Sequence, residues 1–220
     1  MEVATNTKTD NEFSPNLLIG LREEFEQQII AWQTTCDKIP TIWVQRQNLL
    51  ALLTYFRDKA SPRFEMLFDI TAIDERMRVN RQGQPESEFS VVYHLMSFSG
   101  NRDFRIKVPL MDADLNVPTI VGLWPAANWY ERETWDLYGV MFSEHPDLRR
   151  LLTDYGFDGH PLRKDFPLTG NVEVRYDEEQ KRVVYEPVKL SQEYRDFDFE
   201  SPWEGTKYIE KLSESAKKNE

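Results

Sequence analysis

The spacing of apolar residues predicts two helices in the first quarter of the chain. Within residues 17–37, apolar side chains recur every three or four positions and therefore share one side of a helix. These side chains are Leu17, Leu18, Leu21, Phe25, Ile29 and Trp32. The stretch TIWV at 41–44 predicts a strand, and QNLLALLTYFRD at 47–58 predicts the second helix.

Three segments with strand periodicity follow and predict a meander. RFEMLFDI at 63–70 alternates, SEFSVVYHLMSF at 87–98 is apolar on both faces like a central strand, and DFRIKVPL at 103–110 alternates again. The residues expected to face one way are Phe64, Met66, Phe68 and Ile70 in the first segment, and Phe104, Ile106, Val108 and Leu110 in the last. Turn residues around Gly83 and at 99–101 indicate consecutive antiparallel pairing. The prediction is an α+β fold, with N-terminal helices packed on a largely antiparallel sheet.

The pattern changes after the sheet. VPTIVGLWPAANWYERETWDLYGV at 117–140 predicts two helical pieces that are broken at Pro125, the second of which ends at Gly139. From Glu144 the period is lost until two short strands at 172–176 and 182–185. The acidic, aromatic stretch that follows, at 186–203, predicts an extended arm. The expected organisation is a flexible N-terminus at 1–15, an α+β domain at 16–143, a long ordered interface loop at 144–170, and short strands with an extended C-terminal arm at 171–220.

Charge and cysteine content exclude several classes of function. The formal net charge of −11 gives a surface that repels phosphate backbones and anionic lipid, so binding of nucleic acid by the chain alone is not expected. With Cys36 as the single cysteine, the chain can form no internal disulfide and can house no iron–sulfur cluster of its own. We find no secretion or import signal and no apolar run of transmembrane length, so any membrane association is expected to be indirect.

The densest group of charged residues lies between Trp129 and Lys164, and it permits two interpretations. Arg132 and Asp136, four residues apart on a helix, are expected to pair. An enzyme would use Glu131 or Glu133 as base and His145 or His160 as acid, with arginines holding an anion. The other interpretation, which ion-pair statistics favour, is that these charges satisfy one another or form an interface. No metal site is predicted, because His94 stands alone mid-strand and His145 and His160 each precede a proline at a turn or helix start.

Two further features favour an interface. In HPDLRRLL, Pro146 is expected in the first turn of a helix, with Asp147 near the positive end of its dipole. Residues 154–170 have no period but are too aromatic for disorder, so something must order them, and another subunit is the expected agent. The chain also has more large aromatic residues than a small core needs, and some are expected at contacts between subunits. These are Trp124, Trp129, Trp135, Trp203, Tyr130 and Tyr138.

The stretch NWYERETWDLYGVMFSEHPDLRRLLTDYGFDGHPLRKDFPLTG closely resembles the signature of the 30-kDa subunit of proton-translocating NADH:quinone oxidoreductase, respiratory complex I. The resemblance extends from about Pro40 to Trp203 and does not cover the first forty residues. By position, the signature falls on Glu131, Arg132, Glu133, Asp136, Gly139, His145, Pro146, Leu148, Arg149, Arg150, Asp154, Gly156, Gly159, Pro161, Arg163, Lys164, Asp165, Phe166 and Pro167.

The resemblance implies a non-catalytic subunit of the peripheral arm of complex I. Such a protein docks on the large subunit that helps form the quinone site, and it supports electron transfer from NADH to quinone, coupled to proton translocation. It carries no cofactor, because FMN and the iron–sulfur clusters are on partner subunits. The expected location is the cytoplasmic face of the bacterial inner membrane, with the mitochondrial matrix side as the lesser expectation. Two alternatives stay open: the homologous subunit of a membrane-bound hydrogenase-type complex, and a stand-alone acid/base enzyme.

Overall fold

The structure is a computed structural model that describes residues 15–81, 83–192 and 194–195. The chain separates after Gly170 into two compact units. Most of the expected flexible N-terminus at 1–15, the end of the expected arm at 186–203 and Trp203 lie outside the described residues. No helix in the described part of the chain is long and apolar enough to cross a bilayer.

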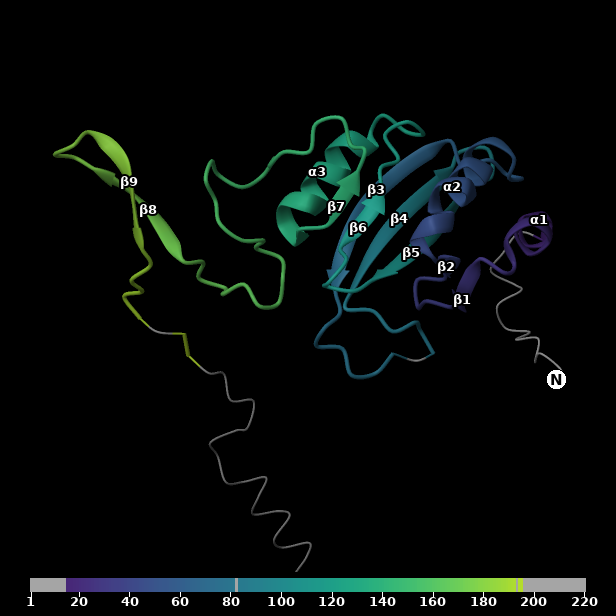
Figure 1. Ribbon diagram of the computed structural model, residues 1–220, viewed down its shortest axis with the longest axis horizontal. Coiled ribbons are helices and arrows are strands. Elements are labelled where there is room, and N and C mark those ends of the chain that lie inside the picture. Colours follow the sequence, from purple (N-terminus) through teal and green to yellow (C-terminus); the bar gives the residue numbers. More distant parts are fainter. Residues whose placement is uncertain (1–14, 82, 193, 196–220) are drawn as a thin grey trace, which may run out of the picture. The chain divides into compact units, whose positions relative to one another are not determined.

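A five-stranded sheet forms the base of the first unit (Figure 1). Its strands are β1 (Ile29–Gln33), β2 (Thr41–Val44), β3 (Met66–Asp74), β4 (Phe89–Ser97) and β5 (Arg102–Leu110). They lie in the order β1-β2-β5-β4-β3, and the pairing of β2 with β5 is parallel while the others are antiparallel. The predicted meander of three consecutive antiparallel strands is confirmed, with β4 in the interior of the sheet.

Helices cover one face of this sheet. The helical elements are α1 (Pro15–Phe25), the 3₁₀ turn η1 (Arg46–Asn48), α2 (Leu49–Asp58) and α3 (Ala127–Tyr138). The ring of Phe56 in α2 lies 4.6 Å from that of Phe104 in β5. The hydroxyl of Thr134 in α3 donates to the carbonyl oxygen of Ile70 in β3 at 3.1 Å. The α+β class, with helices on a mostly antiparallel sheet, is therefore confirmed.

The predicted first helix is too long. It ends at Phe25, and Ile29 and Trp32 lie in strand β1, which pairs with β2. The segment IIAW is a short apolar run, and periodicity alone cannot assign so short a run to a helix or a strand. Residues 29–33 form a strand because they pair with β2, a contact that local sequence patterns do not reveal.

The predicted alternation of β3 is also wrong at its start. Phe64 and Ile70 are buried as expected, but Met66 and Phe68 are exposed and Leu67 is buried instead. The register of β3 against β4 shifts between Leu67 and Asp69. One extra residue at such a bulge moves the side chains that precede it to the opposite face.

The first of the two helical pieces predicted at 117–140 is not a helix. It contains a short strand, β6 (Asn116–Pro118), and a turn; β6 pairs in parallel with β7 (Met141–Ser143). The second piece is α3, and its predicted end is confirmed because Gly139 follows it with φ 79°. A left-handed residue directly after the helix is the usual place for glycine.

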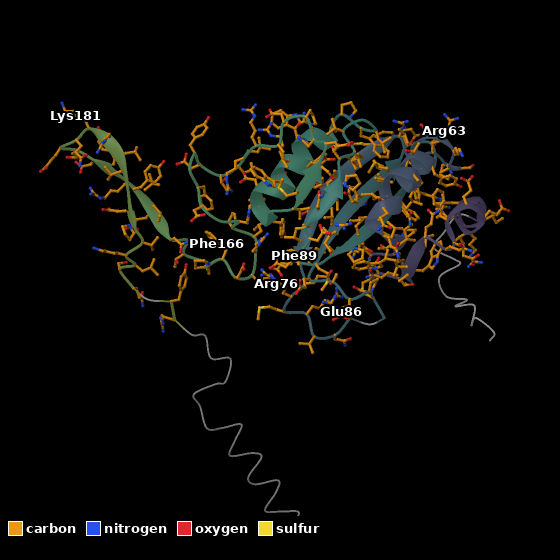
Figure 2. All side chains as sticks on the ribbon, in the orientation of Figure 1. Arg63, Arg76, Glu86, Phe89, Phe166 and Lys181 are labelled. Atoms are coloured by element: carbon orange, nitrogen blue, oxygen red, sulfur yellow. The ribbon has the colours of Figure 1, made fainter. Side chains whose placement is uncertain are left out.

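The second unit contains an antiparallel hairpin, β8 (Val172–Asp177) and β9 (Arg182–Pro187). The two short strands predicted at 172–176 and 182–185 are thus present. Lys181 lies at the turn of the hairpin (Figure 2) and has φ 54°.

Candidate functional site

Helix α3 carries charged side chains into the protein interior. Glu131 and Asp136 are completely buried, and Arg132 retains 6% exposure. Arg132 and Asp136 make their principal contacts with residues 144–170, which we call the signature loop, instead of pairing with each other as predicted. The helix therefore holds the loop through long-range contacts that helical spacing could not reveal.

Asp136 is the main anchor of the signature loop. Its Oδ2 accepts the backbone N–H groups of Leu151, Leu152 and Thr153 at 2.9, 2.7 and 3.0 Å. Its Oδ1 accepts the Thr153 hydroxyl at 2.6 Å and Arg150 Nη1 at 2.8 Å. Burial alone raises the pKa of Asp136, but the hydrogen bonds from Thr153 and the backbone outweigh burial and hold that pKa well below its usual range.

Two arginines bind backbone carbonyl groups of the loop. Arg132 donates to the carbonyl oxygens of Arg149 at 3.2 Å and Arg150 at 3.4 Å, and its guanidinium lies 5.0 Å from the centre of the Trp129 ring. Arg150 donates to the carbonyl oxygen of Gly159 at 3.0 Å. Arg132 thus joins helix α3 to the loop, and Arg150 joins two parts of the loop to each other. The planar guanidinium, with its several N–H donors, suits this bridging role.

The loop also satisfies the carbonyl groups at the end of α3. The ring Nδ1 of His160 lies 2.9 Å from the Asp136 carbonyl oxygen, and the Leu162 N–H donates to the Leu137 carbonyl at 3.1 Å. Arg163 Nε donates to the Tyr138 carbonyl at 2.6 Å. The last carbonyls of a helix have no partner within the helix and carry partial negative charge, so these donors stabilise both helix and loop.

A third anchor, which the sequence patterns did not reveal, lies at the end of strand β3. The buried carboxylate of Asp74 accepts the Lys164 N–H at 2.8 Å and Arg76 Nε at 3.0 Å. Arg76 also pairs with Asp165 at 3.0 Å, and its guanidinium lies 4.8 Å from the centre of the Phe89 ring. Arg76 and Phe89 are labelled in Figure 2. Burial raises the pKa of Asp74, but Arg76 and the backbone N–H groups lower it further, to about 2. The sequence signal that could have indicated this anchor is the position of Asp74, a carboxylate at a buried position of a strand.

These anchors correct two expectations about the loop. No helix begins at Pro146; residues 144–147 form turns, and the backbone from Leu151 is held by Asp136 in place of helical hydrogen bonds. Asp147 N–H instead donates to the His145 ring at 3.1 Å. The aromatic content of residues 154–170 predicted ordering by another subunit, whereas the chain itself supplies anchors at both ends of this stretch.

Glu131 and His145 meet in the protein interior. Glu131 accepts the Thr119 hydroxyl and, at 2.7 Å, the Ile120 N–H, while its Oε2 lies 3.8 Å from His145 Nε2. Both side chains are fully buried. Burial raises the pKa of Glu131 to about 7, although the hydrogen bonds from Thr119 and Ile120 lower it. Burial lowers the pKa of His145. The sequence predicted both residues as acid/base candidates, and the structure brings them together away from solvent.

The raised pKa of Glu131 predicts a pH dependence of stability. The folded state binds a proton that the unfolded state releases near pH 4.5, so the free energy of unfolding falls as pH rises from about 5 through 7. The loss attributable to Glu131 is about 3 kcal/mol. His145 acts in the opposite direction, because its lowered pKa costs stability as pH falls. In urea unfolding across this pH range, the difference in unfolding free energy between Glu131→Gln and wild type should grow as pH rises. Parallel pH profiles of the two proteins would contradict a raised pKa of Glu131.

Gly139 is expected to resist substitution. A Cβ there would lie 2.6 Å from Arg163 Nη2 and 2.7 Å from His160 Nε2, in addition to the strain of the positive φ. Gly139→Ala should therefore cost about 2–3 kcal/mol of unfolding free energy. Gly156 is the matched control, because it has φ 75° but no atom within 4 Å of its Cβ, so Gly156→Ala should cost only about 1 kcal/mol. Equal costs in urea unfolding would show that the loop does not crowd the helix end.

The signature residues divide into three groups by exposure. The buried ones are Glu131, Arg132 and Asp136. The half-buried ones are Glu133, Gly139, His145, Arg150, Gly159, Pro161, Arg163 and Phe166, together with Leu148; in His145 the exposed part is the backbone, because its side chain is buried. The exposed ones are Pro146, Arg149, Asp154, Gly156, Lys164, Asp165 and Pro167. The first two groups build the scaffold, and the third faces solvent with large apolar side chains of the same region.

Those exposed apolar side chains are unusual for a segment so firmly held. Tyr155 is 100% exposed, Leu168 86%, Leu152 60% and Trp129 59%. Within residues 15–81, 83–192 and 194–195, no group of three or more His, Cys, Asp or Glu side chains is placed to hold a metal ion. The arrangement offers a rigid surface with exposed aromatic and aliphatic groups, which is the composition of a protein-binding surface.

The chain is similar to known proteins of one family. A family profile described as "Respiratory-chain NADH dehydrogenase, 30 Kd subunit" matches residues 42–172. An NADH-quinone oxidoreductase subunit of Methylorubrum extorquens is 55% identical over 181 residues, covering 82% of this chain and 78% of that protein. The protein of the same name from Chelativorans sp. is 48% identical over 207 residues, covering 94% of this chain and 99% of that one.

Two solved structures share the fold. The trypsin-resistant fragment (1–134) of Nqo5 superimposes with a TM-score of 0.52 at 26% identity, covering 60% of this chain and 99% of the fragment. A chain of the membrane-bound sulfane sulfur reductase, an archaeal respiratory membrane complex, gives a TM-score of 0.54 at 22% identity, covering 76% of this chain and 96% of that one. The second likeness shows the fold alone.

Proposed function

The chain belongs to the respiratory-chain NADH dehydrogenase 30-kDa subunit family, and from this membership we propose that it is a non-catalytic structural subunit in the peripheral arm of complex I. As a subunit of NADH-quinone oxidoreductase, it works with other chains of that complex. Its own contribution is a preformed docking surface, the signature loop, which supports electron transfer from NADH to quinone and the coupled proton translocation.

One observation carries this proposal: the signature loop is held in place by the chain's own buried charges while its apolar side chains point to solvent. Asp136, Asp74 and the end of α3 fix the backbone, while Tyr155 in the loop and Trp129 in the adjoining helix α3 remain more than half exposed. A surface that is already ordered loses less conformational entropy when a partner binds. Exposed Trp and Tyr are the residues that most often dominate binding energy at protein interfaces.

The proposed partner is the large subunit that helps form the quinone site, which we call the quinone-site subunit. The family resemblance supports this assignment, and the exposed aromatic groups of the loop fit a protein partner. We also propose that FMN and the iron–sulfur clusters are on partner subunits. The single cysteine of the chain supports that distribution, since a cluster needs several thiolate ligands.

The positions of Glu131, His145 and His160 argue against the stand-alone enzyme. Glu131 and His145 have no exposed side-chain surface, so a substrate proton is out of their reach. The ring Nδ1 of His160 is within hydrogen-bond distance of the Asp136 carbonyl oxygen near the end of α3. The hydrogenase-type alternative is less well supported, because the relatives at 48–57% identity carry the NADH-quinone oxidoreductase name, whereas the likeness to the sulfane sulfur reductase is at the level of fold.

The proposed location is the cytoplasmic face of a bacterial inner membrane, with attachment through the other subunits. The relatives named above are bacterial proteins, which supports this choice. Purification of the tagged chain from membranes in mild detergent tests the whole proposal. We expect a large assembly with NADH:quinone reductase activity that contains the quinone-site subunit. Recovery of a lone chain, or of an assembly that oxidises hydrogen and not NADH, would refute it.

A further inference from the structure

The hairpin of the second unit has one entirely apolar face. Cross-strand pairs join Val172 to Pro187, Val174 to Tyr185, and Tyr176 to Val183. Because side chains alternate along a strand, these six residues lie on the same face of the hairpin. The other face carries the pairs Glu173–Glu186, Arg175–Val184 and Asp177–Arg182.

The apolar face is the more exposed of the two. Val172, Val174, Tyr176 and Val183 are between 52% and 58% exposed. On the opposite face Arg175 and Arg182 are exposed, whereas Glu173, Asp177, Val184 and Glu186 are only partly exposed. Arg175 forms an ion pair with Glu186 at 2.7 Å. A two-stranded hairpin is at best marginally stable in water unless its apolar face packs against something. The register therefore points to a surface that is completed by packing against a second apolar surface.

From this register we infer that the apolar face of the β8–β9 hairpin is a second docking surface, which packs face-on against an apolar surface of a neighbouring subunit in the assembly. The inference rests on the proposed function and deepens it by naming a second contact. The contact is made by the side chains of this face and not by hydrogen bonding to the hairpin edges, because every apolar residue of the two strands except Val184 is directed to this face.

Size and charge favour a different subunit over a second copy of this chain. With about 3.3 Å per residue and about 4.8 Å between strands, the face covers roughly 200 Å², far below the roughly 800 Å² per partner of a stable interface. Such a face cannot hold two free chains together, but it can strengthen a complex already formed through another surface, where the effective concentration is high. A second copy, with its own net charge of −11, is also repelled.

Two neighbouring valines provide a matched test of the face. Val183 is on the apolar face opposite Tyr176, and Val184 is on the polar face opposite Arg175. Val183→Glu and Val184→Glu make the same chemical change at adjacent positions of one strand, so any loss of β-propensity is shared. In purification of the full assembly through a tag on this chain, we expect Val183→Glu to lower the recovery of other subunits at least fivefold and Val184→Glu to change it less than twofold.

A photo-crosslinking residue identifies what covers the face. Placed at Tyr176 in the intact complex, it should crosslink to another subunit, whereas the same group at Arg175 should not. Equal recovery of both valine variants, equal loss in both, or crosslinks from Arg175 would overturn the inference while leaving the proposed function intact. A homodimer that Val183→Glu dissociates, or a crosslink from Tyr176 to another part of the same chain, would also overturn it. Recovery of the wild-type chain without any partner would overturn the proposed function as well.

Discussion

Replacement of Asp136 by asparagine is expected to release the first part of the signature loop and to destabilise the protein severely. The carboxylate accepts hydrogen bonds from three backbone N–H groups, the Thr153 hydroxyl and Arg150. An amide has one oxygen and one NH₂ group, so in either orientation donors would face donors. Arg150 would also lose its buried partner, and removal of one member of such a pair costs about 3–5 kcal/mol.

Chemical denaturation should show this loss, and hydrogen exchange should locate it. The amides of Leu151, Leu152 and Thr153 are expected to exchange much faster in Asp136→Asn, while the amides of the interior strand β4 keep their protection. Glu133→Gln, a change of the same chemistry at a half-buried position of the same helix, serves as control and should remain within about 0.5 kcal/mol of wild type. Unchanged exchange at 151–153 would show that Asp136 does not hold the loop.

The local patterns of this chain predict its sheet well because three consecutive strands pair with their sequence neighbours. Residues such as Phe104 and Ile106 alternate with charged residues, and the turn between β4 and β5 is short, so local information is sufficient. Strand β1 and the register shift in β3 depend on partners distant in sequence or on one inserted residue. A periodicity that is only five residues long cannot carry that information.

The candidate site was located by sequence but its geometry was not. The clustering of Asp136, Arg150 and His160 marks the right segment, and the sequence placed Asp136 on a helix. Helical spacing predicted the pairing of Asp136 with Arg132, because contacts within a helix are the ones that spacing reveals. The true partners are 14 to 17 residues away along an irregular loop. Asp74, which lies 90 residues from Lys164, had no signal apart from its inward position on a strand.

Replacement of Tyr155 by glutamate is expected to weaken assembly strongly without weakening the fold. Tyr155 is 100% exposed, and the neighbouring Asp154 accepts its N–H at 2.8 Å, so the backbone of this position is ordered although the ring contacts solvent. An exposed tyrosine on an ordered backbone has the properties of an interface hot spot, and its loss at the centre of an interface costs at least about 2 kcal/mol, or roughly thirtyfold in affinity. A buried, unpaired carboxylate adds a further penalty.

The decisive comparison is between assembly and stability in the same variant. Phe98→Glu is the matched control, because Phe98 is also an aromatic residue at an exposed position, with 65% exposure, but lies in the turn between β4 and β5. In Tyr155→Glu, recovery of the quinone-site subunit with the tagged chain should fall at least tenfold, while the urea midpoint of the isolated chain stays at its wild-type value. A lower urea midpoint in Tyr155→Glu would show that Tyr155 stabilises the fold of the isolated chain. Normal recovery would place the docking surface elsewhere, because a carboxylate that becomes buried without a partner at the centre of an interface must weaken binding.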